Sequence, residues 1–273
     1  MTPTPRSLGY QTDLALLRLE GSQVEAADGY TVVRTPGNPT FWWGNFLLLD
    51  APPQPGSLET WLARFHEAHP QAGHVTLGVD TTDGTLADRT TSEFAAAGFA
   101  VSRNTVLTAA RTSPHRPLPP GVALRPLSSD ADWEAALDLR LAVNAADSQP
   151  HEETGYRAFA GRKLAALRGA GEAGHGSYFG VFEDGRMLTG LGVYDAGEGV
   201  TRYQNVETHP DARSRALAGN LVHFGGEWAR EHLAARTLVI VADPEYHAQR
   251  LYERVGFRPA QVELGLERPP AQP

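Results

Sequence analysis

The sequence from Thr201 to Phe257 decides the fold. Residues 201–220 read TRYQNVETHPDARSRALAGN, and residues 237–257 read TLVIVADPEYHAQRLYERVGF. The first eight residues have the composition of a strand. Residues 213–233 then carry apolar side chains at helical spacing, at Leu217, Leu221, Phe224 and Trp228. The stretch therefore predicts a strand, a tight turn, a helix, a second strand and a second helix.

The turn between that strand and helix gathers small residues and arginines. A helix N-terminus offers unpaired backbone N–H groups and the positive end of the helix dipole. Small side chains let a phosphate group approach this backbone closely. The spacing therefore predicts a pyrophosphate cradle, to which two arginines add positive charge. The predicted cradle residues are Arg213, Ser214, Arg215, Ala216, Leu217 and Ala218.

Two motifs in the stretch resemble the GNAT superfamily of N-acetyltransferases. The run from Pro210 to Ala218 resembles the acetyl-CoA loop of the family, with Ala216 where the family usually has a glycine. Residues 248–257, AQRLYERVGF, resemble its late helix, although Glu245 replaces the Asn that often opens that helix. The motifs follow each other in the family's order, so the pair is more specific than either alone.

Composition limits the class of protein. The 273 residues suffice for a large core and two domains. Hydrophobic residues make up 41% and charged residues 21%, which is ordinary for a soluble globular protein. The absence of cysteine excludes disulfides, thiolate catalysis and Cys-based zinc sites. A net charge of −8 argues against nonspecific nucleic-acid binding and is compatible with cationic substrates or simply with solubility.

The sequence shows no apolar run of membrane-spanning length and no secretory signal, so we expect a cytoplasmic protein. The motif His66-Glu67-Ala68-His69 is too short for a His-Glu-x-x-His zinc site, and no metal site is expected.

Two parts of the chain have the same order of elements. Residues 8–111 and residues 202–266 both predict strand, helix, strand, helix, Gly-Phe and strand. We infer an α/β fold with two GNAT-like domains in tandem, each a mixed central sheet flanked by helices. The expected division is a degenerate domain over 1–111, a Pro-rich linker over 112–121 and an acetyl-CoA-binding domain over 122–273. Asp80–Gly84 is expected at the cradle position of the first domain, where its carboxylates would repel phosphate.

The resemblance implies where acetyl-CoA would bind. In the family it lies in a splay between two central strands, which here are Gln204–Thr208 and Leu238–Ala242. A distorted first strand would leave the backbone N–H groups near Val206 and Thr208 free to bind the pantetheine and to polarise the thioester carbonyl. Tyr252 would be the general acid that protonates the leaving thiolate; the alternative is that Tyr252 is a core aromatic.

Acetyl transfer also requires a neutral amine, and hence a base or a water chain. Glu207 is the candidate base, and the alternative is a solvated or salt-bridged carboxylate. Strand alternation places Tyr203 and Glu207 on one face and Gln204 on the other, but a bulge would break this pattern. The face toward the substrate therefore stays open. His209 is close by and is also consistent with a turn residue.

The acceptor region is expected between the first two helices of the second domain, as is common in the family. Adjacent carboxylates there would receive a cationic amine, or would only begin a helix. The predicted acceptor-binding residues are His151, Glu152, Tyr156 and Gln204.

Together these features predict an N-acetyltransferase that moves an acetyl group from acetyl-CoA to a primary amine by direct attack, without a metal. The alternatives are a noncatalytic acyl-CoA-binding module and an interaction protein that keeps only the fold. The expected partners are acetyl-CoA and a small amine, and homodimerisation stays open.

Overall fold

The computed structural model describes residues 4–114, 116–245 and 248–270. These residues form two compact units. One unit takes the described residues up to Val106, then 241–245, and those from Pro259 onward. The other takes residues from Leu107 to Ile240 and 248–258. The sequence suggests contiguous domains; the compact units are not contiguous, because the last strand of the chain pairs within the first unit.

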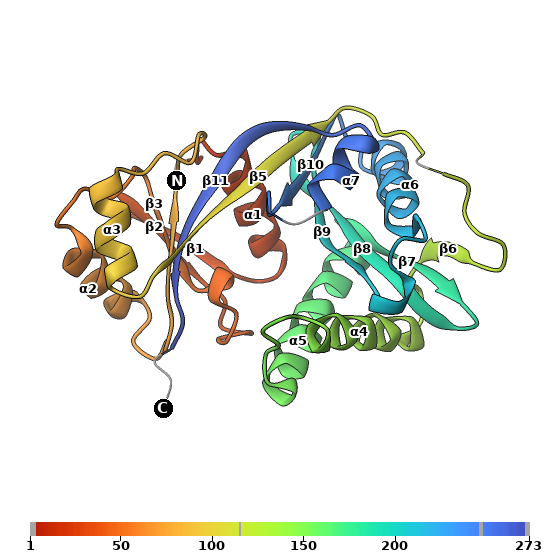
Figure 1. Ribbon diagram of the computed structural model, residues 1–273, viewed down its shortest axis with the longest axis horizontal. Coiled ribbons are helices and arrows are strands. Elements are labelled where there is room, and N and C mark those ends of the chain that lie inside the picture. The colour runs from red at the N-terminus through yellow and green to blue at the C-terminus, as the bar shows by residue number, and fades with distance from the viewer. Residues whose placement is uncertain (1–3, 115, 246–247, 271–273) are drawn as a thin grey trace. The chain divides into compact units, whose positions relative to one another are not determined.

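The first unit is a mixed sheet with helices on both faces (Figure 1). Its strand order is β1-β2-β3-β4-β11-β5, in which β3 and β4 are parallel and β11 is antiparallel to β4. Its elements are α1 (Leu8–Leu19), β1 (Gln23–Ala27), β2 (Tyr30–Arg34), η1 (Trp42–Gly44), β3 (Phe46–Leu49), α2 (Leu58–Ala68), β4 (Val75–Val79), α3 (Asp88–Ala96), β5 (Ala100–Ala109) and β11 (Arg258–Arg268).

Strand β3 shows how this unit buries its core. Successive side chains of a strand point to opposite faces, and all four of its residues are buried. Phe46 and Leu48 pack in a cluster with Tyr10 of α1. Leu47 and Leu49 pack in the other cluster, which contains residues of α2 and α3. A continuous apolar run, FLLL, is therefore explained by a sheet covered on both faces.

Two buried histidines belong to the α2 side of this core. The rings of His69 and His74 have centroids 4.7 and 5.6 Å from that of Phe65. Burial lowers the pKa of His69 to about 4, and burial also lowers the pKa of His74. Burial therefore disfavours the charged form of both rings.

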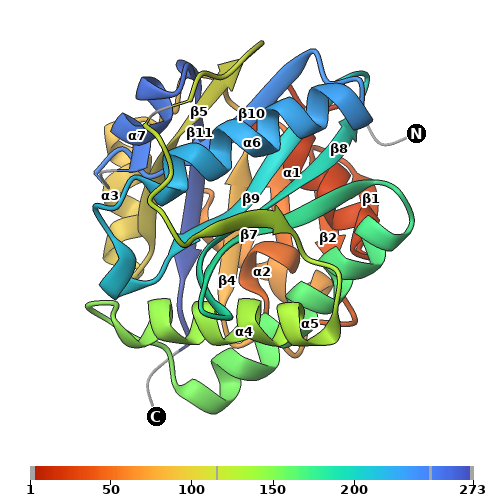
Figure 2. The same ribbon diagram turned by 90° about the vertical axis from the view of Figure 1, so that its right-hand side faces the viewer.

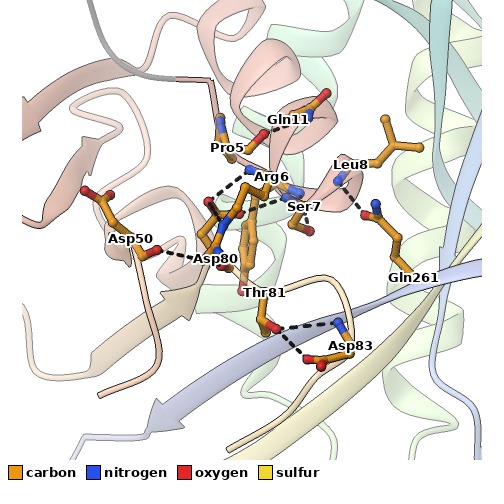
Figure 3. A network of polar contacts seen from close by, with 11 residues as sticks. Pro5, Arg6, Ser7, Leu8, Gln11, Asp50, Asp80, Thr81, Asp83 and Gln261 are labelled. Carbon is orange, nitrogen blue, oxygen red and sulfur yellow. Dashed lines mark hydrogen bonds and ion pairs between the residues drawn. The ribbon is translucent and has the colours of Figure 1, made fainter. Parts of the chain in front are cut away.

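Asp80 serves a structural purpose at the end of β4. Its carboxylate accepts the backbone N–H groups of Arg6 and Ser7 at 2.9 and 2.8 Å (Figure 3). Its own N–H donates to the carbonyl of Leu49 at 2.8 Å. Asp80 thus holds the residues that lead into α1 against the end of β4.

The structure corrects the cradle position expected in the first unit. The parallel pair β3–β4 and its crossover helix α2 correspond in order to β9, α6 and β10 of the second unit. The counterpart of the cradle is therefore the loop 50–57 before α2, and Asp80–Gly84 follows the second strand of the pair. Strands β3 and β4 stay paired to their last residues, Leu49 and Val79, so they do not splay.

The second unit is a sheet in the order β10-β9-β8-β7-β6. Strands β7 and β8 form an antiparallel hairpin that turns at Asp184-Gly185, and both turn residues have positive φ, 49° and 80°. The elements are β6 (Ala123–Pro126), α4 (Asp130–Ala145), α5 (Glu153–Glu172), β7 (Gly176–Glu183), β8 (Arg186–Gly197), β9 (Val200–Thr208), η2 (Pro210–Ala212), α6 (Leu217–His232), β10 (Thr237–Ala242) and α7 (Ala248–Arg254).

Helices cover the two faces of this sheet separately. Neighbouring residues of β7 show the division, since Tyr178 packs against Trp133 of α4 while Phe179 packs against Phe224 and Trp228 of α6. Figures 1 and 2 both show α6 on one side of β7–β9 and α4 and α5 on the other. Any side chain of β9 therefore faces either α6 or the α4–α5 pair.

Candidate functional site

Strand β9 carries a bulge at its centre. Its antiparallel register with β8 joins Gly192 to Gln204 and Gly190 to Glu207, so three steps on β9 face two steps on β8. Asn205, inside the bulge, has a φ of 52°, a left-handed backbone that side-chain-bearing residues adopt rarely. The structure thus contains the distortion that the family resemblance implies for this strand.

The bulge moves Glu207 to the opposite face from Tyr203. The hydroxyl of Tyr203 donates to the carbonyl of Val222 on α6 at 2.8 Å. Glu207 instead lies against α4, with Oε1 3.6 Å from Nη2 of Arg140. Regular alternation would have placed both side chains on one face. The sequence did not decide which face of the sheet Glu207 would take. In the structure it lies on the face covered by α4 and α5.

Strands β9 and β10 pair only at their starts. The parallel register runs from Val200–Thr237 to Arg202–Val239 and extends no further among the described residues. From Tyr203 to Thr208, β9 consequently has backbone N–H and C=O groups that β10 does not pair. Unpaired backbone groups at the centre of a sheet need another partner, so this stretch is suited to bind an extended ligand.

The predicted cradle forms the start of α6. Ser214 and Ala216 have positive φ values of 65° and 60°. The helix begins at Leu217, four residues after the expected start at Arg213, because a left-handed residue cannot continue a right-handed helix. Ala216 makes no side-chain cap, which leaves the first N–H groups of α6 available to an anion.

The two arginines of the cradle differ in their contacts. Arg215 forms a two-bond ion pair with Glu183 at the end of β7, one bond of which measures 3.0 Å. The hydrogen bonds from Arg215 hold the pKa of Glu183 below its usual value. Arg213 is exposed and has no ion pair within the described part of the chain. Arg213 is therefore the cradle arginine with an uncommitted charge.

A buried polar cluster surrounds Glu207. Nη2 of Arg140 contacts Glu207 at 3.6 Å and donates to the hydroxyl of Tyr156 at 3.5 Å. Burial raises the pKa of Glu207, and the charge of Arg140 offsets part of that effect. Burial also raises the pKa of Tyr178, with Glu207 adding to it. A carboxylate with a raised pKa can accept a proton near neutral pH.

Two of the predicted acceptor residues adjoin this cluster. The ring of His151 stacks on that of Tyr156, with centroids 5.7 Å apart and planes 3° apart. Asn144 fixes the backbone of His151 by donating to its carbonyl and accepting its N–H, both at 3.0 Å. The structure therefore connects His151, Tyr156 and Glu207 through Arg140.

Arg140 is the member of this cluster that the sequence analysis did not single out. It lies on α4 with Ala136 and Asn144, four residues away on either side, and all three are buried. The apolar residues spaced one turn apart on the same helix, Trp133, Leu137 and Leu141, are only half-buried. Polar residues at i and i+4 from a small buried residue are a weak signal, because an arginine on a helix is usually exposed.

Two other predicted acceptor residues lie apart from the cluster. Glu152 caps α5, accepting the N–H groups of Thr154 and Gly155 at 2.8 and 2.7 Å, and these bonds lower its pKa. Gln204 is half-buried beside the bulge, where it pairs with Gly192 of β8. Their roles toward an acceptor stay predictions.

Tyr252 is buried on α7, which is consistent both with a general acid and with a core aromatic. Its ring lies 6.4 Å from that of Phe257, which in turn lies 5.6 Å from the ring of Tyr203 on β9. His209 acts as a turn residue, since its Nδ1 accepts the N–H of Asp211 at 3.2 Å. Burial lowers the pKa of His209.

A cavity of about 320 Å³ opens beside α4. Its lining comes from α4, the β7–β8 turn and the residue before η2: Ala135, Asp138, Leu139, Gly185, Arg186, Met187 and His209. Within the described ranges no helix is long and apolar enough to cross a membrane. A search of the same residues finds no group of three or more His, Asp or Glu side chains placed to hold a metal ion.

One family model matches part of the chain. Residues 137–257 match the model of the acetyltransferase (GNAT) family. No curated protein matches the chain. A solved structure of a conserved protein of unknown function from Staphylococcus epidermidis has a TM-score of 0.71 at 11% identity, covering 90% of this chain and 94% of that one.

Two further solved structures are named for the family. A GCN5-related N-acetyltransferase from Kribbella flavida has a TM-score of 0.62 at 16% identity, covering 96% of this chain and 97% of its own. A tandem GNAT protein from the clavulanic acid biosynthesis pathway has a TM-score of 0.53 at 16% identity, with 96% and 88% covered. These likenesses show the fold, an α/β architecture of two such domains in tandem.

Proposed function

We propose that the second unit, whose residues 137–257 match the model of the acetyltransferase (GNAT) family, transfers an acetyl group from acetyl-CoA to a primary amine by direct attack. The observation that carries the proposal is the bulged strand β9, which parts from β10 directly before the anion-binding start of α6.

The residues of the second unit fit the donor. The N–H groups at the start of α6, from Leu217 and Ala218, suit a pyrophosphate, and Arg213 adds an uncommitted positive charge. Backbone groups of Val206 and Thr208 belong to the stretch that β10 leaves unpaired, where they would hold the pantetheine and polarise the thioester carbonyl. Acetyl-CoA would supply the activated acetyl group.

Two side chains would move protons. Glu207 would take a proton from the attacking amine, a task suited to a carboxylate whose pKa burial raises. The amine nitrogen bonds to the carbonyl carbon as the carbon–sulfur bond breaks, and Tyr252 would give its hydroxyl proton to the leaving thiolate. His151 and Tyr156 would border the acceptor, since both adjoin the Glu207 cluster.

The first unit would take no part in the chemistry. Its paired strands β3 and β4 do not splay, and the loop before α2, residues 50–57, contains no arginine. A coenzyme would therefore find neither an open strand nor a cationic cradle there. We assign it a structural purpose.

One experiment series tests the function. Acetyl-CoA should raise the thermal unfolding midpoint of the full chain, because a ligand that binds only the folded state stabilises it. A panel of amines is then assayed by release of free thiol. Binding with thiol release would support the enzyme, binding without any turnover would support an acyl-CoA-binding module, and the absence of binding would contradict both.

A further inference from the structure

Resting on the proposed function, we propose that the acceptor is an α-amino acid, whose amine is received by Glu207 and whose carboxylate is received by Arg140. The inference starts from polar atoms in the cluster that the protein itself leaves without partners.

Arg140 and Glu207 are incompletely satisfied. The Nε and Nη1 groups of Arg140 are buried and have no hydrogen-bond partner among the described residues. Oε2 of Glu207 is also buried and has no hydrogen-bond partner among these residues. The side chain of Arg140 is 7% exposed and that of Glu207 is 15% exposed. Buried charged groups without hydrogen bonds are costly, so a site of this kind is expected to be filled by a ligand or by water.

The polar atoms without hydrogen-bond partners indicate which chemical groups a ligand would need. Nε and Nη1 of Arg140 only donate, so they require an acceptor such as a carboxylate. Oε2 of an ionised Glu207 only accepts, so it requires a donor such as an amine. A simple amine would leave Arg140 unfilled, and a simple acid would leave Glu207 unfilled while bringing a second negative charge beside it.

The distance between Glu207 and Arg140 and their charges narrow the class of acceptor further. Glu207 and Arg140 lie 3.6 Å apart, so the two groups of a ligand that contacts both must be close in its covalent structure. In an α-amino acid they are separated by a single carbon. The pair carries one charge of each sign, which matches a zwitterion with no net charge. Polyamines and aminoglycosides carry only the positive half of this pattern.

An aromatic pair lies beside the cluster and would border the side chain of such a ligand. His151 and Tyr156 form a stacked aromatic pair next to Arg140, and His151 is exposed. In the transfer, one ammonium proton of the amino acid passes to Glu207, and the freed amine nitrogen bonds to the acetyl carbon as the carbon–sulfur bond breaks. Tyr252 protonates the leaving thiolate, and the nitrogen loses its second proton as the amide forms. The carboxylate keeps its charge and its contact with Arg140 throughout.

The test compares amino acids with the same molecules lacking the carboxylate. The full-length protein is assayed by thiol release with lysine and cadaverine, phenylalanine and 2-phenylethylamine, and tyrosine and tyramine. We expect the best acceptor to be an amino acid with kcat/KM about 30-fold or more above its decarboxylated partner, because a hydrogen bond to a charged group is lost. Equal or better turnover of the decarboxylated amine in every pair would overturn the inference.

Variants of Arg140 test whether this residue causes the preference for amino acids over amines without a carboxylate. Arg140→Gln should reduce the preference for the amino acid to within about threefold, whereas Arg140→Lys, which keeps a cation, should retain part of it. A preference unchanged in a folded Arg140→Gln protein would contradict the assignment. If Arg140→Gln does not fold, the double variant R140Q/E207Q, which leaves no charge unpaired, is compared with E207Q by calorimetric titration of the amino acids.

The outcome separates this inference from the proposed function. Acetylation of amines with no carboxylate preference would retain the function and reject the inference. Arg140-dependent amino-acid binding without any response to acetyl-CoA would reject the function and retain the binding site. Absence of amino-acid binding would indicate that water alone fills the cluster, and would reject the inference.

Discussion

Tyr203 and Glu207 lie four residues apart on β9, yet Tyr203 bonds to α6 and Glu207 to α4, on opposite faces of the sheet. The left-handed Asn205 between them produces this reversal. The bulge therefore determines which side chain of β9 reaches the face covered by α4 and α5.

The backbone of Asn205 can be tested by a pair of substitutions. Asn205→Val should lower the free energy of unfolding by about 1–2 kcal/mol, because a β-branched residue at positive φ is strained. Asn205→Gly should change it by less than about 1 kcal/mol, since glycine adopts this conformation freely. Urea unfolding of both variants measures the difference, and equal stability would refute a left-handed bulge.

Ala216 offers a second backbone test. Its left-handed conformation suits glycine, so Ala216→Gly should raise the free energy of unfolding by about 0.5–1 kcal/mol. Ala218→Gly is the matched control, because position 218 is helical and glycine there should cost about 0.5–1 kcal/mol. Opposite signs are expected, and acetyl-CoA affinity should not fall in Ala216→Gly.

The two cradle arginines should contribute unequally to coenzyme affinity. Arg213→Gln should weaken acetyl-CoA binding about tenfold, because a free positive charge near a phosphate is lost. Arg215→Gln should weaken it less, since Glu183 already neutralises that residue. Calorimetric titration measures both, and a larger effect at position 215 would show that the Arg215–Glu183 pair opens to the ligand.

Glu207 should govern the acid side of the pH–rate profile. Only the ionised carboxylate accepts a proton, so turnover should fall as the pH drops through the raised pKa of Glu207. Glu207→Gln should lower kcat about 100-fold or more and remove this limb of the profile. Glu153→Gln, on the exposed start of α5, is the control and should leave the profile unchanged.

His69 should make the first unit sensitive to acid. Its folded pKa of about 4 lies below the unfolded value near 6.5, so the unfolded state binds the proton more readily. The contribution of neutral His69 to the free energy of unfolding is fully present above pH 6.5. It is lost as the pH falls from 6.5 toward 4, by on the order of 2 kcal/mol. Unfolding of His69→Gln should show a weaker loss over this window, and the exposed His66→Gln should not.

The sequence predicted the order of elements from Thr201 to Phe257 because apolar spacing and turn residues are local signals. The hairpin at Asp184-Gly185 was predictable for the same reason. The left-handed backbone of Ser214 and Ala216 was not predictable, since neither residue type signals that conformation. Arg140 was missed because its partner Glu207 is distant in sequence and reaches the α4 face only through the bulge.

Strand pairing across the chain was also beyond local signals. The sequence suggested a C-terminal strand in the second domain, but β11 pairs with β4 of the first unit, for example Leu264 with Val79. A strand pattern specifies which face is buried and does not specify the partner strand.

That pairing has a consequence for the order in which the protein can be made. Residues 75–79 leave the ribosome long before residues 264–268, which complete their sheet. The first unit therefore keeps an open edge at β4 throughout synthesis, although domains usually fold as they emerge. An early-emerging half that waits for the last strand is exposed to wrong pairing for nearly the whole time of translation.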